Sequence, residues 1–206
     1  MTGTAESQRL PLFPLQTVLF PGGPLPLRIF EPRYVDMIGR CMKAGTGFGV
    51  VLIREGGEVG SVGAVADIGT HARIEDFSQL PDGLLGLLCR GDRRFRLLDR
   101  HQAADGLNVG TIEWLIDAPR VPLPAEFEPL AALLERVLPE LGALYANIET
   151  RFDDADWVGC RLAEILPIEQ GEKQRLLEAA DPVERLVRLA PLLRPAAEES
   201  LPDEAN

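Results

Sequence analysis

Residues 10–34 read LPLFPLQTVLFPGGPLPLRIFEPRY and hold six prolines among leucine, valine, isoleucine and phenylalanine. Proline fixes φ and removes a backbone N–H donor, so it is confined to edge strands, bulges, turns and the first turn of a helix. The segment is too apolar for a linker and too interrupted for a central strand or a helix. We therefore predict short extended pieces on the rim of a sheet.

The pattern of apolar residues changes near Pro119. The N-terminal part holds β-type runs punctuated by glycine and acidic residues, which are FGVVLI, VGAVADIG, ARIEDF, LLGLLCR, RRFRLLD and LNVGTIEWLI. One helix interrupts them: Pro32 suits its first turn, Val35, Ile38 and Met42 follow helical spacing, and Gly45 marks its end. This part is predicted to be mostly sheet.

Beyond the connection DAPRVPLPAEFEP, the apolar period changes from two to about 3.6 residues. LAALLERVLPELGALYANI predicts a helix broken at Pro139, DWVGCRLAEIL one capped by Asp156, and QRLLEAA a short one. DPVERLVRLAPLL predicts a helix with Asp181 as its cap, Pro182 in its first position and Glu184 completing a capping box. The fold class is therefore α+β.

Charge is distributed unevenly along the 206 residues, whose formal net charge is −11. Residues 1–120 carry 13 Lys and Arg against 14 Asp and Glu, whereas residues 121–206 carry 8 against 18. Acidic surface repels a phosphate backbone, so a general nucleic-acid role is disfavoured. The acidic half would instead select basic segments of a partner, with binding that weakens as salt rises.

A local basic patch is the exception to this acidity. RGDRRFRLLDR places Arg90, Arg93, Arg94, Arg96 and Arg100 close together in sequence. Two explanations stay open, a nucleic-acid or small-ligand site and the solvated face of a strand, and the alternation of charged and apolar residues favours the second.

The motifs of several enzyme classes are absent from the sequence. The two lysines, Lys43 and Lys173, follow methionine and glutamate, which excludes a P-loop, and no serine lies in a recognisable nucleophile motif beside them. His71 and His101 neither begin an HExxH motif nor suffice for a three-histidine zinc site. We predict no catalytic residue, no cofactor and no metal.

Three cysteines, Cys41, Cys89 and Cys160, lie far apart without a CxxC pair. This spacing suggests neither a disulfide framework nor a zinc knuckle, so a reducing cytoplasm is the expected location. The sequence has no basic start followed by an apolar run and no run of 18 apolar residues, so neither a targeting nor a membrane segment is expected. A Cys/His nucleophile pair stays open as an alternative, although core packing explains these cysteines more simply.

Several phrases resemble one known family. PLFPLQTVLFPGGPLPLRIFEPRY, GTHARIEDF, GDRRFRL, DWVGCRLAEILPI and KQRLLEAADPVERL are similar to the N-terminal substrate-binding domain of Lon ATP-dependent proteases, in particular its small stand-alone members. The likeness covers about residues 9–193, and its most specific phrase is Phe30-Glu31-Pro32-Arg33-Tyr34. The chain departs from full-length Lon in lacking the ATPase and Ser/Lys protease modules.

The resemblance implies a PUA-like, β-barrel-like domain over residues 9–118 and a helical bundle over 125–195, followed by a disordered acidic tail, 196–206. In that barrel the first segment would pair along one side only, with five apolar side chains filling the interior: Leu12, Phe13, Leu15, Val18 and Phe20. The same β fold occurs in cereblon, a substrate receptor of a ubiquitin ligase. The implied function is a non-catalytic module that binds peptides or partly unfolded proteins.

Candidate binding residues follow the same phrase. Arg28, Glu31, Arg33 and Tyr34 are either the edge of a peptide groove or, as paired charges favour for the first three, an internal salt bridge beside a packed tyrosine. Two further functions stay open: a PUA-like nucleic-acid or small-ligand protein, and a hydrolase with an unrecognised site. The sequence leaves the identity of the partner and the oligomeric state undecided.

Overall fold

The computed structural model describes residues 7–58, 62–116, 119–146 and 148–193. Within these residues the strands are Gln8–Leu15 (β1), Pro24–Ile29 (β2), Phe48–Leu52 (β3), Ile68–Gln79 (β4), Leu85–Gln102 (β5) and Asn108–Trp114 (β6). The helices are Pro32–Ala44 (α1), Glu128–Val137 (α2), Ala155–Ile165 (α3), Gln170–Glu178 (α4) and Pro182–Leu189 (α5). Short 3-10 helices span Ala125–Phe127 (η1), Leu138–Leu141 (η2) and Ala190–Leu193 (η3). The predicted tail, 196–206, lies outside the described residues.

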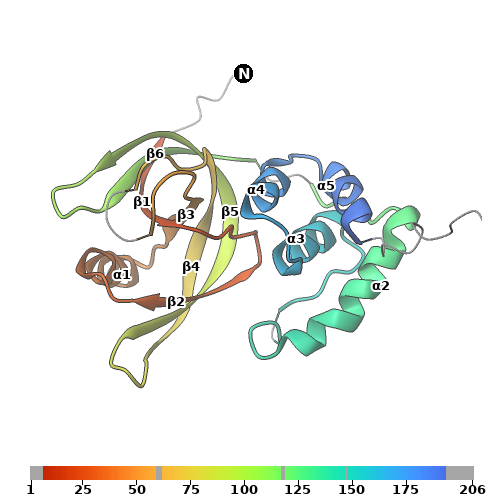
Figure 1. The fold of residues 1–206 in the computed structure, drawn as a ribbon, viewed down its shortest axis with the longest axis horizontal. Helices are drawn as coiled ribbons and strands as arrows, with labels where there is room; N and C mark the ends of the chain where they lie inside the picture. The colour runs from red at the N-terminus through yellow and green to blue at the C-terminus, as the bar shows by residue number, and fades with distance from the viewer. Residues whose placement is uncertain (1–6, 59–61, 117–118, 147, 194–206) are drawn as a thin grey trace, which may run out of the picture.

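The sheet closes on itself. Its strand order is β2-β5-β4-β3-β1-β6, and β5 also pairs with β6. β2 pairs with the first part of the long strand β5, β6 pairs with the last part, and only the β1–β3 pairing is parallel. Figure 1 shows the barrel-like sheet on one side and α2 to α5 on the other. This arrangement confirms the predicted α+β class.

The prolines of β1 are accommodated by a change of partner along the strand. Residues Gln8–Leu12 pair with β6 and residues Leu12–Leu15 with β3, so the two pairings overlap only at Leu12. Pro11 and Pro14 therefore each sit where one side of the strand is paired, and neither costs a ladder hydrogen bond. The expected rim position is right for β2 and wrong for β1, which lies inside the sheet. The five side chains expected in the interior, Leu12, Phe13, Leu15, Val18 and Phe20, are all buried.

One predicted turn is absent. LLGLLCR and RRFRLLD form a single strand, β5, in place of two strands joined at Gly91 and Asp92. Gly91 instead allows close approach, because a Cβ there would lie 2.1 Å from the carbonyl oxygen of Phe20. VGAVADIG is likewise not one strand, since its described residues form two isolated bridges, at Val62 and Val65, before β4 begins.

Helix α1 begins and ends as predicted, with Pro32 in the first turn and Gly45 in the left-handed conformation at φ 62°. The buried face of this helix differs from the one that the spacing of Val35, Ile38 and Met42 predicts. Tyr34, Met37, Ile38 and Cys41 face the barrel, whereas Val35 and Met42 are exposed.

The helical part joins the barrel through a shared core. One cluster of buried residues combines Val18, Phe20, Leu52, Ala66 and Ile68 of the β part with apolar residues of the four helices α2 to α5. Asp181 caps α5 as predicted, but α3 begins two residues earlier than expected and is capped by Asp154 in place of Asp156, with the Asp154 side chain accepting from the Asp156 N–H. Glu184 pairs with Arg188 on its own helix.

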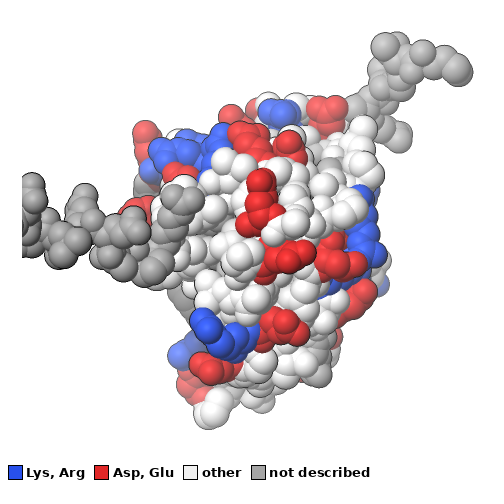
Figure 2. All heavy atoms as spheres, turned by 90° about the vertical axis from the view of Figure 1, so that its right-hand side faces the viewer, with Lys and Arg blue, Asp and Glu red and all other residues white. Residues whose placement is uncertain are grey.

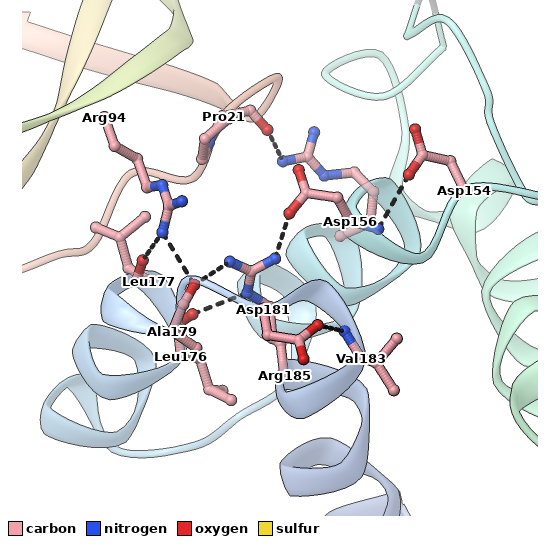
Figure 3. A network of polar contacts seen from close by, with 11 residues as sticks. Pro21, Arg94, Asp154, Asp156, Leu176, Leu177, Ala179, Asp181, Val183 and Arg185 are labelled. Carbon is pink, nitrogen blue, oxygen red and sulfur yellow. Dashed lines mark hydrogen bonds and ion pairs between the residues drawn. The ribbon is translucent and has the colours of Figure 1, made fainter. Parts of the chain in front are cut away.

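Buried polar side chains also cross the junction (Figure 3). Arg94 of β5 donates from Nη1 to the carbonyl oxygens of Leu177, at 2.7 Å, and Ala179, at 3.0 Å. Gln174 of α4 donates to the Ile68 carbonyl oxygen at 2.9 Å, and Arg161 of α3 to that of Pro21 at 2.7 Å. These bonds fix the helical part against the barrel. The described helices are too short or too polar to cross a lipid bilayer.

Candidate functional site

An apolar cleft separates the β4–β5 hairpin from the helical part. Its volume is about 810 Å³. Pro26 of β2, Leu88 of β5 and Phe77 of β4 line it from the sheet, and Leu144, from the segment after η2, lines it from the helical part. The cleft therefore lies over three strands and is bordered on one side by Leu144 of the other half.

Glycines shape the hairpin side of the cleft. Gly83 turns the chain at φ 82°, and the Leu80 N–H donates to the Leu84 carbonyl oxygen at 2.8 Å. Leu80 then folds over Gly86, where a Cβ would lie 2.8 Å from Leu80 Cδ2. Glycine at this position lets the Leu80 side chain pack closely against the hairpin and line the cleft.

The cleft offers apolar surface with a charged rim. The side chain of Phe77 is 56% exposed and that of Leu144 is 38% exposed. Arg28 and Asp82, both of which line the cleft, form an ion pair. Exposed aromatic and aliphatic groups beside a concave surface are typical of sites that bind apolar parts of another molecule.

The predicted binding residues divide between this cleft, a partly exposed ion pair and the buried core. Arg28 lines the cleft, whereas Glu31 and Arg33 form a salt bridge at 2.7 Å with each other, and Arg33 also donates to the Gly106 carbonyl oxygen at 3.0 Å. Tyr34 is buried, and its ring stacks on that of Phe13 with centroids 4.0 Å apart. These contacts favour a structural role for Glu31, Arg33 and Tyr34, and their part in binding stays a prediction.

The predicted basic patch does not form one surface. Arg94 is buried at the junction, and Arg90 donates to the Glu75 carboxylate at 2.7 Å and to the Gly22 carbonyl oxygen at 3.1 Å. Arg93 lies over the Trp114 ring, 3.8 Å from its centroid, and Arg96 is exposed. The arginines face different surroundings, so they give no continuous track for a phosphate backbone.

A second cavity, of about 590 Å³, brings Cys41 and His71 together among its lining residues. His71 Nδ1 lies 3.1 Å from an Asp92 carboxylate oxygen, and burial lowers the pKa of this histidine. Cys41 donates from Sγ to the Gly47 carbonyl oxygen at 3.3 Å, and burial raises the pKa of its thiol. A nucleophilic cysteine needs a lowered pKa, so this pair lacks the electrostatics of a Cys/His catalytic site. No group of three or more potential metal ligands occurs among the described residues.

Sequence reasoning missed Phe77 and Leu144. The signal for Phe77 was weak because a register shift between Ile74 and Asp76 breaks the alternation of β4. Leu144 enters the cleft only through the tertiary packing of a segment 67 positions further along the chain.

Comparison with known proteins identifies the fold and the family. Residues 9–194 match the family described as the ATP-dependent protease La (LON) substrate-binding domain. A Lon N-terminal domain protein from Xanthomonas campestris is 40% identical, with 91% of this chain and 99% of that chain covered and a TM-score of 0.76. The N-terminal domain of Mycobacterium avium complex Lon protease shares the fold, with a TM-score of 0.62 at 17% identity over 89% of this chain and 97% of that one.

The curated relatives are longer proteins. Lon protease 2 of Myxococcus xanthus is 28% identical over 193 residues, which are 90% of this chain and 23% of that protein. Lon protease 2 of Herpetosiphon aurantiacus is 30% identical over 200 residues, 92% of this chain and 24% of that protein. The chain thus spans about a quarter of these relatives, and the part it matches is the non-catalytic substrate-binding domain. The chain belongs to the LON substrate-binding domain family.

Proposed function

We propose that this chain is a non-catalytic protein-interaction module that binds apolar segments of peptides or partly unfolded proteins in the cleft. The observation that carries the proposal is the position of Phe77, more than half exposed, beside the cleft that Leu144 borders from the other half. Membership of the substrate-binding domain family supports the same function.

The expected affinity contribution follows from apolar burial. A phenylalanine side chain removes on the order of 150–250 Å² from water when fully buried, so covering half of the exposed part of Phe77 removes about 50 Å². At about 25 cal/mol per Å², this burial contributes about 1.2 kcal/mol, close to a tenfold change in Kd. Such contacts require apolar side chains from the partner but no particular sequence.

The test is binding of a permanently unfolded probe. Fluorescein-labelled, reduced and carboxymethylated α-lactalbumin is titrated with the chain, and anisotropy gives Kd. Phe77→Ser should weaken binding about tenfold. Leu98→Ser, at a β5 side chain that is 53% exposed and does not line the cleft, is the matched control and should leave Kd within about twofold.

Two results would count against the proposal: no binding by the natural chain, or equal effects of the two serine variants. Leu144→Ser provides a second check from the opposite wall of the cleft. Circular dichroism of each variant distinguishes lost contacts from lost folding.

The proposal has several further parts. It includes the layout of a β domain over 9–118 and a bundle over 125–195, the absence of ATPase and protease activity, and a location in the cytoplasm. The three cysteines are free and buried, which suits a reducing compartment. Nucleic acid is not proposed as a partner, because the net charge is −11 and Arg94 is occupied inside the fold.

A further inference from the structure

We propose that the cleft takes an apolar segment with basic flanks and holds it through side chains alone, without adding a strand to the sheet. This inference rests on the proposed function and specifies its substrate class. Three observations carry it: the outer edge of β2, the outer edge of β4, and the excess of acidic residues on the helical part.

The outer edge of β2 lacks most of its donors. The Gly91 N–H donates to the Gly23 carbonyl oxygen at 2.9 Å, which sets the phase of the β2–β5 ladder. In an antiparallel pair successive residues point alternately toward and away from the partner, so Pro24, Pro26 and Arg28 point away from β5. Two of these three positions are prolines and have no N–H. An added strand would therefore find acceptors along β2 but a donor only at Arg28.

The outer edge of β4 is blocked by different means. Its pairing with β3 covers only Thr70–Ala72, which leaves the edge of the remaining residues without that neighbour. A register shift between Ile74 and Asp76 distorts this edge, and the Asp76 carboxylate accepts the Phe77 N–H at 2.8 Å. Bulges and occupied donors prevent strand addition at sheet edges.

Strand addition normally supplies affinity through main-chain hydrogen bonds. Because β2 and β4 border the cleft on its two sides and neither offers a regular ladder, the bound backbone has no partner in the sheet. The groups left to make contact are apolar, chiefly Phe77, Leu88 and Leu144. The module should thus accept an apolar segment whether or not its backbone N–H groups can donate hydrogen bonds. A segment that contains proline should bind as well.

The helical part supplies the charge preference. Four exposed glutamates of η1, α2 and η2 form no ion pair within the described part of the chain, namely Glu126, Glu128, Glu135 and Glu140. They lie outside the lining of the cleft, and Glu140 is the nearest in sequence to Leu144, which it precedes by four residues. Arg136 is the one cation within η1, α2 and η2, so the four glutamates outnumber it, and Arg161 and Arg185 of this half are buried. Figure 2 shows the outer end of the helical part, on the side away from the barrel, with acidic side chains across its centre and basic ones nearer its margins. Lysine or arginine beside the apolar segment would be attracted toward these glutamates at low salt, where screening is weak.

The test uses three synthetic peptides labelled with fluorescein. One has an apolar stretch of leucine, valine and phenylalanine between lysine pairs, the second carries N-methyl groups on four amides of that stretch, and the third has glutamate pairs as flanks. If the peptide bound by strand addition, N-methylation would weaken its Kd about fivefold for each hydrogen bond removed. We expect the N-methylated peptide to bind within about threefold of its parent.

The flank preference is tested by salt and by substitution. At about 0.02 M salt the lysine-flanked peptide should bind at least about fivefold more tightly than the glutamate-flanked one, and the ratio should fall toward one at about 0.5 M. Glu135→Gln with Glu140→Gln should reduce the ratio. The control pair, Asp36→Asn with Asp99→Asn, removes the same charge from exposed positions of the β part and should leave it unchanged.

The outcomes separate this inference from the proposed function. If the parent peptide binds in a Phe77-dependent way but N-methylation abolishes binding, the inference is wrong and the function stands. Equal binding of lysine-flanked and glutamate-flanked peptides at low salt would overturn it as well. If no peptide binds, or Phe77→Ser changes nothing, the proposed function itself fails.

Discussion

The shared core makes a specific prediction about cooperativity. Phe20 is fully buried in the cluster that contains residues of both the barrel and the bundle, among them Leu162 and Leu186. Replacing a buried phenylalanine by alanine costs about 3–5 kcal/mol, as lost transfer free energy plus the cavity left behind. Because the cluster belongs to both halves, Phe20→Ala should lower the free energy of unfolding of the whole chain and not of the barrel alone.

The two tryptophans allow each half to be followed separately. Trp114 lies on β6 and Trp157 on α3, so Trp114→Phe leaves a reporter in the bundle and Trp157→Phe one in the barrel. With an m value of about 2.5 kcal/mol/M in urea, a loss of about 4 kcal/mol lowers the midpoint by about 1.6 M. Fluorescence in both tryptophan backgrounds should show the same lowering of the urea midpoint.

A different shift for the two reporters would refute the reasoning. If Trp114 reported the full loss and Trp157 none, the halves would unfold independently and the shared cluster would not couple them. Phe20→Leu, with a cost of about 1 kcal/mol, serves where the alanine variant is too unstable to study.

The remaining predictions concern the sheet edge, a buried hydroxyl and the buried thiols. Pro24→Val with Pro26→Val restores two donors to β2 and should produce concentration-dependent self-association in sedimentation equilibrium, and a strictly monomeric double variant would contradict the blocked-edge argument. The buried Tyr34 hydroxyl has no hydrogen-bond partner within the described part of the chain, so Tyr34→Phe should raise the free energy of unfolding by about 1 kcal/mol in urea titration, and a loss of that size would reveal a missed contact. Burial raises the pKa of Cys89 to about 12 and that of Cys160 to about 11, so both thiols stay protonated in the folded state while those of the unfolded chain ionise. The free energy of unfolding should therefore fall as pH rises above about 8.5, by up to about 1.4 kcal/mol per pH unit for each thiol. Urea titrations at several pH values measure this dependence, and Cys89→Ala should make it less steep.

The sequence predicted the features that depend on local patterns. The change of apolar period near Pro119 separates the sheet from the helices, and Pro32 and Gly45 mark the ends of α1. The prolines of β2 correctly predict an edge strand. Each of these signals acts within one turn or one strand, so neighbouring residues suffice to read it.

Features that depend on distant neighbours could not be read in the same way. β1 lies inside the sheet because β6, about a hundred residues later, pairs with its first half. Gly91 suggests a turn from sequence alone, but the carbonyl group of Phe20 requires glycine there. The buried face of α1 depends on where the barrel lies, which the spacing of Val35 and Met42 did not show.

The candidate site was only partly accessible to sequence reasoning. Of the residues proposed from the phrase around Tyr34, Arg28 lies in the cleft, while Glu31 and Arg33 bond to each other within the fold. The phrase around Tyr34 forms the start of α1. Its resemblance to the family therefore reflects the requirements of folding as much as those of binding. The cleft itself needs Leu144 from the other half, a contact that only the assembled structure creates.

The shared core also governs the order in which the chain can fold during synthesis. Phe20 leaves the ribosome long before Leu186, with which it shares a core, and translation at roughly 5–20 residues per second makes this interval about ten to thirty seconds. During that time the apolar face of the barrel segments lacks part or all of the four helices that cover it. The nascent barrel is thus an exposed apolar polypeptide of the kind that chaperones bind, and its burial is incomplete until α5 has been made.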